Sequence, residues 1–282
     1  MTGAAPSLLS VLDLREMEGS PDRFIVGSHW TPHGLSYGGQ MVGQSAAAAL
    51  RTVPDDRHAH SMHGYFLRAG DASKPIEYQV ERLQDGRSIS HRRVQAYQDG
   101  ALIWSTIVTL KNALEGPSHQ SEMPDVPGPE EIQRTPLFGS TTQATADDEA
   151  FEMRRFTADD LDRVGGQDVG RIAMWIRGQG DLPDDPGFHA SALAYASDFG
   201  PLFSVLRRHG ISSGPDIRIT SIDHAVWWHV PARVDQWLLY VVESPRSGGG
   251  GGLSLGRFFT QDGTLVASTA QEGIARGPKP VS

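Results

Sequence analysis

A short sequence occurs twice in the chain, near the end of each half. Just after the repeat, the two halves differ at a position that carries a reactive side chain in only one of them. Residues 98–106 read QDGALIWST and residues 261–269 read QDGTLVAST, with six of nine residues identical. Two residues after each copy, Val108 in the first half stands where Gln271 stands in the second. A repeat this long predicts two similar tandem domains, since solenoid units recur every ~20 to 50 residues. The second half is therefore the first place to look for a site.

Glycines and histidines in the first half supply further candidates. Gly38 and Gly39 begin a helical pattern, where free backbone N–H groups favour an anion or a carbonyl oxygen. On the strand that follows, His58 and His60 would share one face while His63 points away. This alternation disfavours a shared metal ion, and we predict no metal site.

Composition narrows the classes of protein. The chain has 282 residues, no cysteine and a formal net charge of −9. Nucleic acid is disfavoured as the main partner, because phosphate binding needs clustered Lys and Arg. There is no run of ~18 apolar residues and no signal-peptide pattern at the N-terminus. We expect a cytoplasmic protein that has no membrane span and no thiolate or disulfide chemistry.

Each half is predicted to hold one helix and an antiparallel meander, which makes an α+β protein. The first domain, 1–113, has a helix at 38–51 and strands at 23–26, 61–67, 76–83, 89–98 and 102–110. The last domain, 151–282, has a helix at 189–199 and strands at 172–177, 217–229, 236–243, 253–260 and 265–274. Asp-Gly pairs at 85–86 and 99–100 are strong hairpin signals. The proline-rich, acidic stretch 114–150 is predicted to be a partly extended linker.

A long helix wrapped by an antiparallel sheet, twice in one chain, describes a double hotdog, and the sequence resembles the acyl-CoA thioesterase II (TesB-like) family. The matching blocks are YGGQMVGQ at 37–44, HSMHGYFLR at 60–68, RRV at 92–94, AYASD at 194–198, SIDH at 221–224, WLLY at 237–240 and STAQEG at 268–273. The resemblance implies hydrolysis of fatty acyl-CoA to free fatty acid and CoA, with no metal or organic cofactor.

The resemblance also implies three catalytic residues that hold and activate the attacking water. They are Asp198, Gln271 and Ser221, where Ser221 stands at a position that is Thr in the family. A Ser hydroxyl can still donate and accept hydrogen bonds, although Thr220 would be the partner if the strand register slipped by one. We expect Asp198 to be the general base, because an apolar setting near a helix C-terminus raises a carboxyl pKa.

Substrate contacts are expected in the first half. The resemblance implies CoA phosphates, and the nearest basic set is Arg68, Arg92 and Arg93, of which alternation allows only one of the last two to face a given ligand. Gly38 and Gly39, the start of the second helix near His189, and Gln271 are alternative donors to the oxyanion. His63 is expected to help shape the cleft. His224 follows Asp223, and we expect these two to pair at the end of their strand.

Two other functions fit the same fold. An enoyl-thioester hydratase or dehydratase would use a His with a carboxylate, and a non-catalytic acyl-CoA-binding protein would release no thiol. The carboxylate of Asp198 at the helix favours hydrolysis over the first alternative. Sheet edges invite association, so we also expect a homo-oligomer.

Overall fold

The computed structural model describes residues 7–28, 34–135, 150–157, 160–161, 170–211 and 218–276. The first half contains α1 (Leu8–Val11), β1 (Arg15–Met17), β2 (Ser20–Val26), α2 (Gly38–Leu50), β3 (His58–Phe66), β4 (Ile76–Asp85), β5 (Ile89–Gln98) and β6 (Ala101–Lys111). The second contains β7 (Phe151–Arg155), β8 (Ile172–Gly178), α4 (Pro186–Ala196), α5 (Phe203–Arg208), β9 (Arg218–Ser221), β10 (Asp223–Trp228), β11 (Leu238–Gly248), β12 (Gly251–Thr260) and β13 (Leu265–Arg276). A 3-10 turn, η1 (Pro129–Glu131), lies between them.

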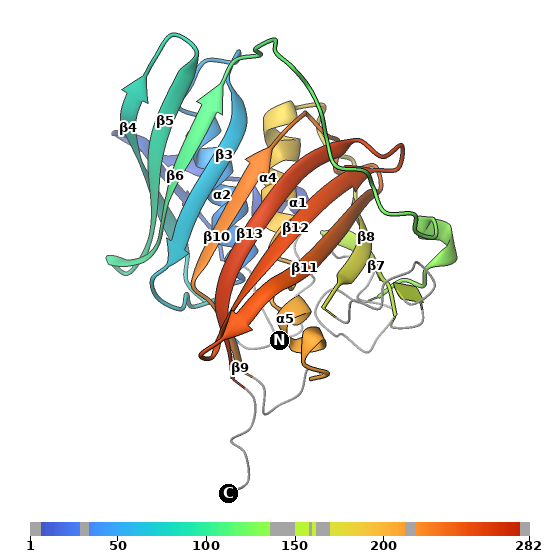
Figure 1. Ribbon diagram of the computed structural model, residues 1–282. Helices are drawn as coiled ribbons and strands as arrows, with labels where there is room; N and C mark the ends of the chain where they lie inside the picture. The colour runs from blue at the N-terminus through green and yellow to red at the C-terminus, as the bar shows by residue number, and fades with distance from the viewer. Residues whose placement is uncertain are drawn as a thin grey trace, which may run out of the picture.

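The strands form one curved antiparallel sheet, and both long helices lie against its inner face (Figure 1). The strand order is β1-β2-β4-β5-β6-β3-β10-β13-β12-β11-β8-β7, with β9 paired to β13. The two halves meet where β3 pairs with β10. Each half repeats one helix wrapped by a meander, so the expected α+β double hotdog is confirmed.

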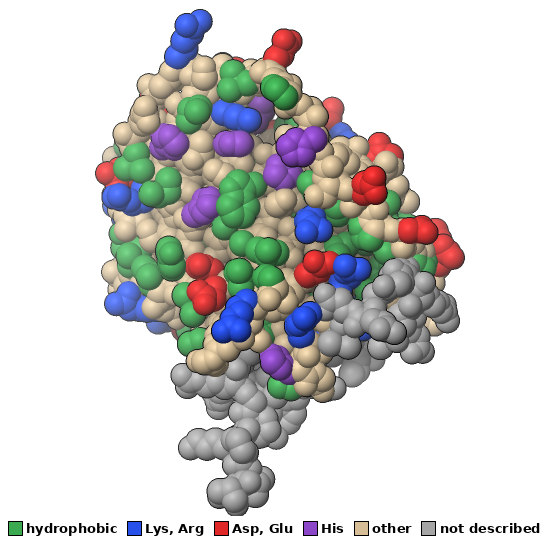
Figure 2. Space-filling view, viewed as in Figure 1, with side chains coloured by type: hydrophobic (Ala, Val, Ile, Leu, Met, Phe, Trp, Pro, Cys, Tyr) green, Lys and Arg blue, Asp and Glu red, His purple; other side chains and the backbone are tan. Residues whose placement is uncertain are grey.

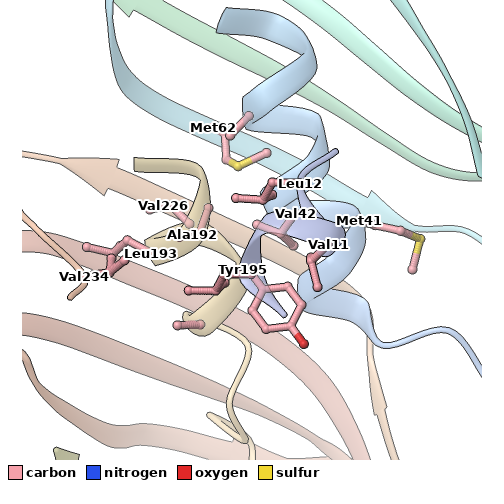
Figure 3. Close-up of a cluster of buried hydrophobic side chains, with 14 of the residues drawn as sticks. Val11, Leu12, Met41, Val42, Met62, Ala192, Leu193, Tyr195, Val226 and Val234 are labelled. Atoms are coloured by element: carbon pink, nitrogen blue, oxygen red, sulfur yellow. The ribbon is translucent and has the colours of Figure 1, made fainter. Parts of the chain in front are cut away.

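One hydrophobic core serves both halves, and α2 and α4 lie at its centre (Figure 3). Val42 of α2 lies beside Tyr195 of α4, whereas Met41 and Leu193 point to opposite sides of the helix pair, and all four are almost fully buried. Both helices are rich in Ala, a strong helix former with a short side chain, so their backbones can approach closely. A Cβ on Gly43 would lie 2.8 Å from the Ser191 carbonyl oxygen. The glycine is therefore required by the packing between the two helices.

The segment 112–135 crosses from the first half to the second as an extended chain (Figure 1). Gln120 accepts a hydrogen bond from the Leu265 N–H and donates to the Gly263 carbonyl. Met123 and Val126 pack on a second hydrophobic cluster, and the Trp175 indole donates to the Pro127 carbonyl at 2.9 Å. The described part of the expected linker is thus fastened to the outer face of the second half. The remainder of the expected linker, apart from Ala150, lies outside the described residues.

Within the described residues, the outer face of the first half has no such cover, and hydrophobic and histidine side chains gather on the face seen in Figure 2. Tyr65 and Ile107 are 57% and 45% exposed there. Among the described helices, none combines the length and apolar character that crossing a bilayer would require.

Several elements differ from those expected from the sequence, and two of the differences bear on the site. The second helix ends at Ala196, so Asp198 lies just beyond its C-cap, Ser197. The strand expected at 217–229 is interrupted at Ile222 and becomes β9 and β10. Helices α1 and α5 and strands β1 and β7 were not expected, because short elements carry too little periodicity to be recognised.

Replacing Gly43 tests whether close helix packing limits stability. In an exposed helix, Gly→Ala stabilises by up to ~1 kcal/mol. At Gly43 the new methyl group would meet the Ser191 carbonyl and the Tyr195 Cβ, at 2.8 and 2.9 Å. Overpacking of this kind costs ~1–3 kcal/mol, so we expect Gly43→Ala to lower the melting temperature.

Gly116→Ala is the matched control, because nothing lies within 4 Å of its added Cβ. Calorimetry of both variants decides the point. An unchanged or raised melting temperature for Gly43→Ala would contradict the packing argument.

Candidate active site

Asp198 lies where the C-terminal end of α4 meets the N-terminal end of α2. A Cβ on Gly38 would lie 2.6 Å from Asp198 Oδ2, so only glycine permits this approach. Burial raises the pKa of Asp198 to about 7, while hydrogen bonds from Gln271 and from the Gly39 backbone act in the opposite direction. A carboxyl group with this pKa can take up and release a proton near neutral pH.

Gln271 connects the three polar residues that the sequence analysis singled out. Its Nε2 donates to Asp198 Oδ1 at 3.0 Å and to Ser221 Oγ at 2.5 Å. An amide nitrogen has two hydrogens, and both are used in these contacts. The structure therefore brings Asp198, Ser221 and Gln271 together, but leaves Gln271 no donor for an oxyanion.

His224 fixes the orientation of the Gln271 amide. Its Nδ1 lies 2.7 Å from Gln271 Oε1, and its Nε2 lies 2.7 Å from Ser197 Oγ. The ring is fully buried, and burial lowers the pKa of His224 to about 4, so it is neutral. Since Gln271 Oε1 can only accept, Nδ1 carries the proton. The expected pair with Asp223 is wrong, because Asp223 instead accepts from the Glu272 N–H.

The interruption at Ile222 places Ser221 and His224 on the same side of the strand. Residues three apart in a regular strand point to opposite faces. Here Ser221 pairs with Gly273, Ile222 donates its N–H to the Glu272 carbonyl, and the regular pairing resumes at Ala225. Both side chains consequently reach Gln271. Thr220 is exposed, so Ser221 and not Thr220 is the partner of Gln271.

Aromatic rings enclose the carboxyl group. Tyr37 stacks on Phe199 with ring centroids 5.8 Å apart and donates its hydroxyl to the Tyr195 carbonyl. Burial and the negative charge of Asp198 raise the pKa of Tyr37, so its hydroxyl stays protonated. Tyr240 donates to the Ser197 carbonyl at 2.8 Å and so holds the end of α4. This apolar wall is the physical cause of the raised pKa of Asp198.

The first half contains an apolar counterpart of the site. Thr52 Oγ1 bonds the Ala49 carbonyl as Ser197 Oγ bonds the Ala194 carbonyl, which aligns Val53 with Asp198. The pairing of β3 with β6 repeats that of β9 and β10 with β13, including the interruption. The aligned pairs are Val53 with Asp198, Ala59 with Ser221, Met62 with His224 and Val108 with Gln271. Every polar group of the site is replaced by an apolar side chain.

The expected substrate contacts are only partly brought to the site. Gly38 and Gly39 lie beside Asp198. Arg68 lies in the loop after β3, two residues beyond Phe66, whose ring approaches Gly38. It is exposed, and its Nη1 donates to the Leu102 carbonyl.

Arg92 does not suit a phosphate site, contrary to expectation. It is 1% exposed, and its guanidinium donates to Thr52, Gln84, His91 and Asp85, which uses all five N–H groups. Alternation predicted only that Arg92 and Arg93 lie on opposite faces of their strand, and the fold turns the Arg92 face inward against the end of α2.

His63 and Arg93 lie on the outer face of the sheet, away from the helices. His63 packs edge-on against Trp227 at 4.8 Å, and Arg93 pairs with Glu81 at 2.8 Å. Neither side chain shares the face of Gln271. The structure therefore supports no contact between them and a substrate held at Asp198.

Comparison with protein families matches both halves of the chain. Residues 26–111 match the model for the acyl-CoA thioesterase N-terminal domain, and residues 146–274 match the acyl-CoA thioesterase model. The second match includes Asp198, Ser221 and Gln271.

Individual relatives are similar over nearly the full length. Human acyl-coenzyme A thioesterase 8 is 35% identical, covering 97% of this chain and 90% of the relative. Acyl-CoA thioesterase 2 of Haemophilus influenzae is 33% identical over 85% of this chain and 87% of its own. The crystal structure of acyl-CoA thioesterase II TesB2 from Mycobacterium marinum superposes with a TM-score of 0.82 at 37% identity, covering 98% of this chain and 99% of that chain.

The raised pKa of Asp198 predicts how stability depends on pH. Between its usual value of 3.8 and about 7, the folded state holds a proton that the unfolded state has lost. The free energy of unfolding therefore falls as pH rises through this range. Asp198→Asn removes the ionisation, so we expect it to stabilise the protein more at pH 8 than at pH 5.

Urea denaturation of wild type and variant at the two pH values measures this. The exposed Asp181→Asn is the control. If the two variants changed stability equally at both pH values, the raised pKa would be refuted.

Proposed function

Because this chain belongs to the acyl-CoA thioesterase II (TesB-like) family, we propose that it hydrolyses fatty acyl-CoA to a free fatty acid and CoA through water activated by Asp198. The observation that carries the mechanism is the carboxyl group with a pKa of about 7, held by Gln271 against the start of α2. Thioester hydrolysis needs a water, a base for its proton and a donor for the developing oxyanion. In this site Ser221 can orient the water, and Asp198 can take its proton.

In the proposed reaction, the Asp198 carboxylate takes one proton from a water whose oxygen attacks the thioester carbonyl carbon. The Ser221 hydroxyl accepts from Gln271, so its own hydrogen is free to orient that water. The tetrahedral intermediate then collapses, and the carbon–sulfur bond breaks. The departing thiolate takes the proton from Asp198, which leaves CoA-SH, the carboxylic acid and a regenerated base.

The oxyanion donor is proposed to come from the first turn of α2. Tyr37, the N-cap residue, makes no side-chain cap hydrogen bond. The Gly39 N–H is bonded to Asp198 and the Gln40 N–H to the Tyr37 carbonyl, so the amide proposed as the donor is that of Gly38. The N-terminus of a helix also carries a partial positive charge that stabilises an anion. Gln271 cannot fill this role, because both of its N–H groups are engaged.

The hydratase alternative is disfavoured by His224. A dehydratase would need a His that reaches the substrate, whereas both nitrogens of His224 are engaged and the ring is fully buried. A protein that only binds acyl-CoA would have no use for a base with a pKa near neutral, and thiol release separates these cases directly.

Assembly and location stay predictions. The exposed Tyr65 and Ile107 on the outer sheet face support the expected homo-oligomer, because apolar surface of this kind is buried in interfaces. Family membership does not fix the compartment, so the expected cytoplasmic location rests on the sequence alone.

Replacing Asp198 tests the proposed base. General acid–base catalysis contributes ~10²- to 10⁴-fold, so we expect Asp198→Asn to lower kcat by at least ~100-fold. In wild type, kcat is expected to rise as pH increases through about 7, because the carboxylate is the active form. Thiol release from short to long acyl-CoAs measures both effects.

Asp181→Asn again serves as the control and is expected to keep full turnover. Unchanged kcat in Asp198→Asn would remove Asp198 from the mechanism. No thiol release from any acyl-CoA by wild type would overturn the hydrolase proposal itself.

His224 is proposed as a positioning residue, acting through Gln271. His224→Met copies the apolar residue of the first half, and we expect kcat to fall ~10-fold or more, as loss of an orienting partner typically does. The hydrogen bond from Gln271 lowers the pKa of Asp198. If the Gln271 amide lost its orientation, the rise of kcat with pH should therefore shift to higher pH. His224→Asn keeps an amide donor near the position of Nδ1, so it should restore part of kcat and part of the original pH dependence.

Separate kcat, KM and pH profiles for the two variants distinguish positioning from general damage. If both variants lost kcat equally and the pH dependence of kcat did not shift, His224 would act only through stability.

A further inference from the structure

A second pocket lies at the opposite end of the helix pair from Asp198. It has a volume of about 740 Å³ and lies between the C-terminal end of α2 and the N-terminal end of α4. It is the counterpart, in the repeated fold, of the proposed active site, and Val53 and Ala59 line it. Its size falls within the ~300–1,000 Å³ typical of small-molecule sites.

Much of the lining is apolar. Leu50 and Val53 of the first half face Phe188, Leu193 and Trp228 of the second across the pocket. A surface of this kind favours a hydrocarbon chain, because each CH₂ group removed from water contributes ~0.8 kcal/mol.

Two residues of the lining, His189 and Arg57, carry buried polar atoms without partners. His189 is 2% exposed, and within the described residues its Nε2 has no hydrogen-bond partner. Its Nδ1 accepts from the Val234 N–H at 3.3 Å, so Nε2 carries a hydrogen and is a donor. The side chain of Arg57 is 10% exposed, and its Nε and Nη1 form no hydrogen bond in the same part of the chain. Buried donors of this kind are costly unless something accepts from them.

The donors are held in place, and the charge of the pocket suits an anion. Arg57 Nη2 donates to the Gly86 and Arg87 carbonyls, which fixes the guanidinium. Lys111 lies in the same lining. The acids of the lining are Asp55 and Asp185, and Asp185 Oδ1 already accepts from the Gly187 N–H. Asp56, outside the lining, places its Oδ1 3.7 Å from Arg57 Nε, which is an ion pair without a hydrogen bond. An anionic head group could therefore accept hydrogen bonds that the protein leaves unmade.

The pocket cannot repeat the proposed hydrolysis. Val53, Ala59 and Val108 take the places of the base, the hydroxyl and the amide. The first turn of α4 is capped by its N-cap residue, Asp185, whereas Tyr37, the N-cap residue of α2, makes no side-chain cap hydrogen bond. A ligand bound here would leave unchanged.

We propose that this pocket is a second, non-catalytic site for an acyl chain with an anionic head group, which is either a free fatty acid or an acyl-CoA. The chain would lie among Leu50, Val53 and Trp228, and the head group would accept from Arg57, His189 and Lys111. The proposal rests on the lining and does not require that Asp198 be a base.

Calorimetric titration of the full chain tests the stoichiometry with two probes. Palmitate represents the free acid, and a hexadecyl-CoA thioether, which has no carbonyl to attack, represents the ester. We expect at least one probe to bind with a second equivalent for each chain. Val53→Trp fills the pocket and should remove that equivalent, and Lys111→Gln should weaken it at least ~5-fold, the loss of one charge-assisted contact of ~1 kcal/mol or more.

Lys74→Gln is the matched control, because it removes the same charge from an exposed residue outside the pocket. Lys111→Gln keeps the test decisive should the larger Trp prevent folding. The probe that supplies the second equivalent identifies the head group.

One equivalent of each probe, unaffected by Val53→Trp and Lys111→Gln, would overturn the proposal, as would equal weakening by Lys74→Gln. Thiol release is measured on the same preparations. Its absence alongside a second equivalent would refute the proposed hydrolysis and leave the second site intact.

Discussion

The carbonyl oxygen of Tyr195 lies 2.3 Å from where a Cβ on Gly39 would be, so α2 and α4 meet backbone to backbone. This contact sets the distance between the end of one helix and the start of the other. It presses Asp198 against Gly38, which strips water from the carboxyl group and raises its pKa. The sheet is wrapped around the helix pair, and the positions of Gln271 and His224 follow from that wrapping. A larger residue at Gly38 or Gly39 would change the distance between the helices, the pKa of Asp198 and the positions of Gln271 and His224 together.

The two halves show how one backbone can support two different chemistries. Their strand pairings agree down to the interruption that lies at Ile222 in one half and at His60 in the other. At the four aligned site positions, the side chains are polar in one copy and apolar in the other. Because both copies belong to one chain, each could change without changing the other, which an exchange-symmetric dimer of identical subunits does not allow.

Local patterns in the sequence predicted the fold, and the resemblance to a family singled out Asp198, Ser221 and Gln271, but neither predicted what surrounds these three residues. The repeat, the helical spacing and the Asp-Gly turns are local signals that tertiary contacts reinforce. The contact of His224 with Gln271 depends on an irregularity at Ile222, which a periodic pattern cannot reveal. Arg92 was misjudged for a related reason: alternation tells which residues share a face, but not whether that face lies against a helix end or against water.

The fastening of residues 112–135 along the second half bears on how the halves find each other. A loose tether would let the second half of one chain complete the first half of another, which is the usual route to domain-swapped dimers. Gln120 and the Pro127 carbonyl tie the connecting segment down, and this shortens the free length between the halves. The effective concentration of each half near its own partner rises accordingly. Intramolecular pairing of β3 with β10 is thereby favoured over exchange between chains.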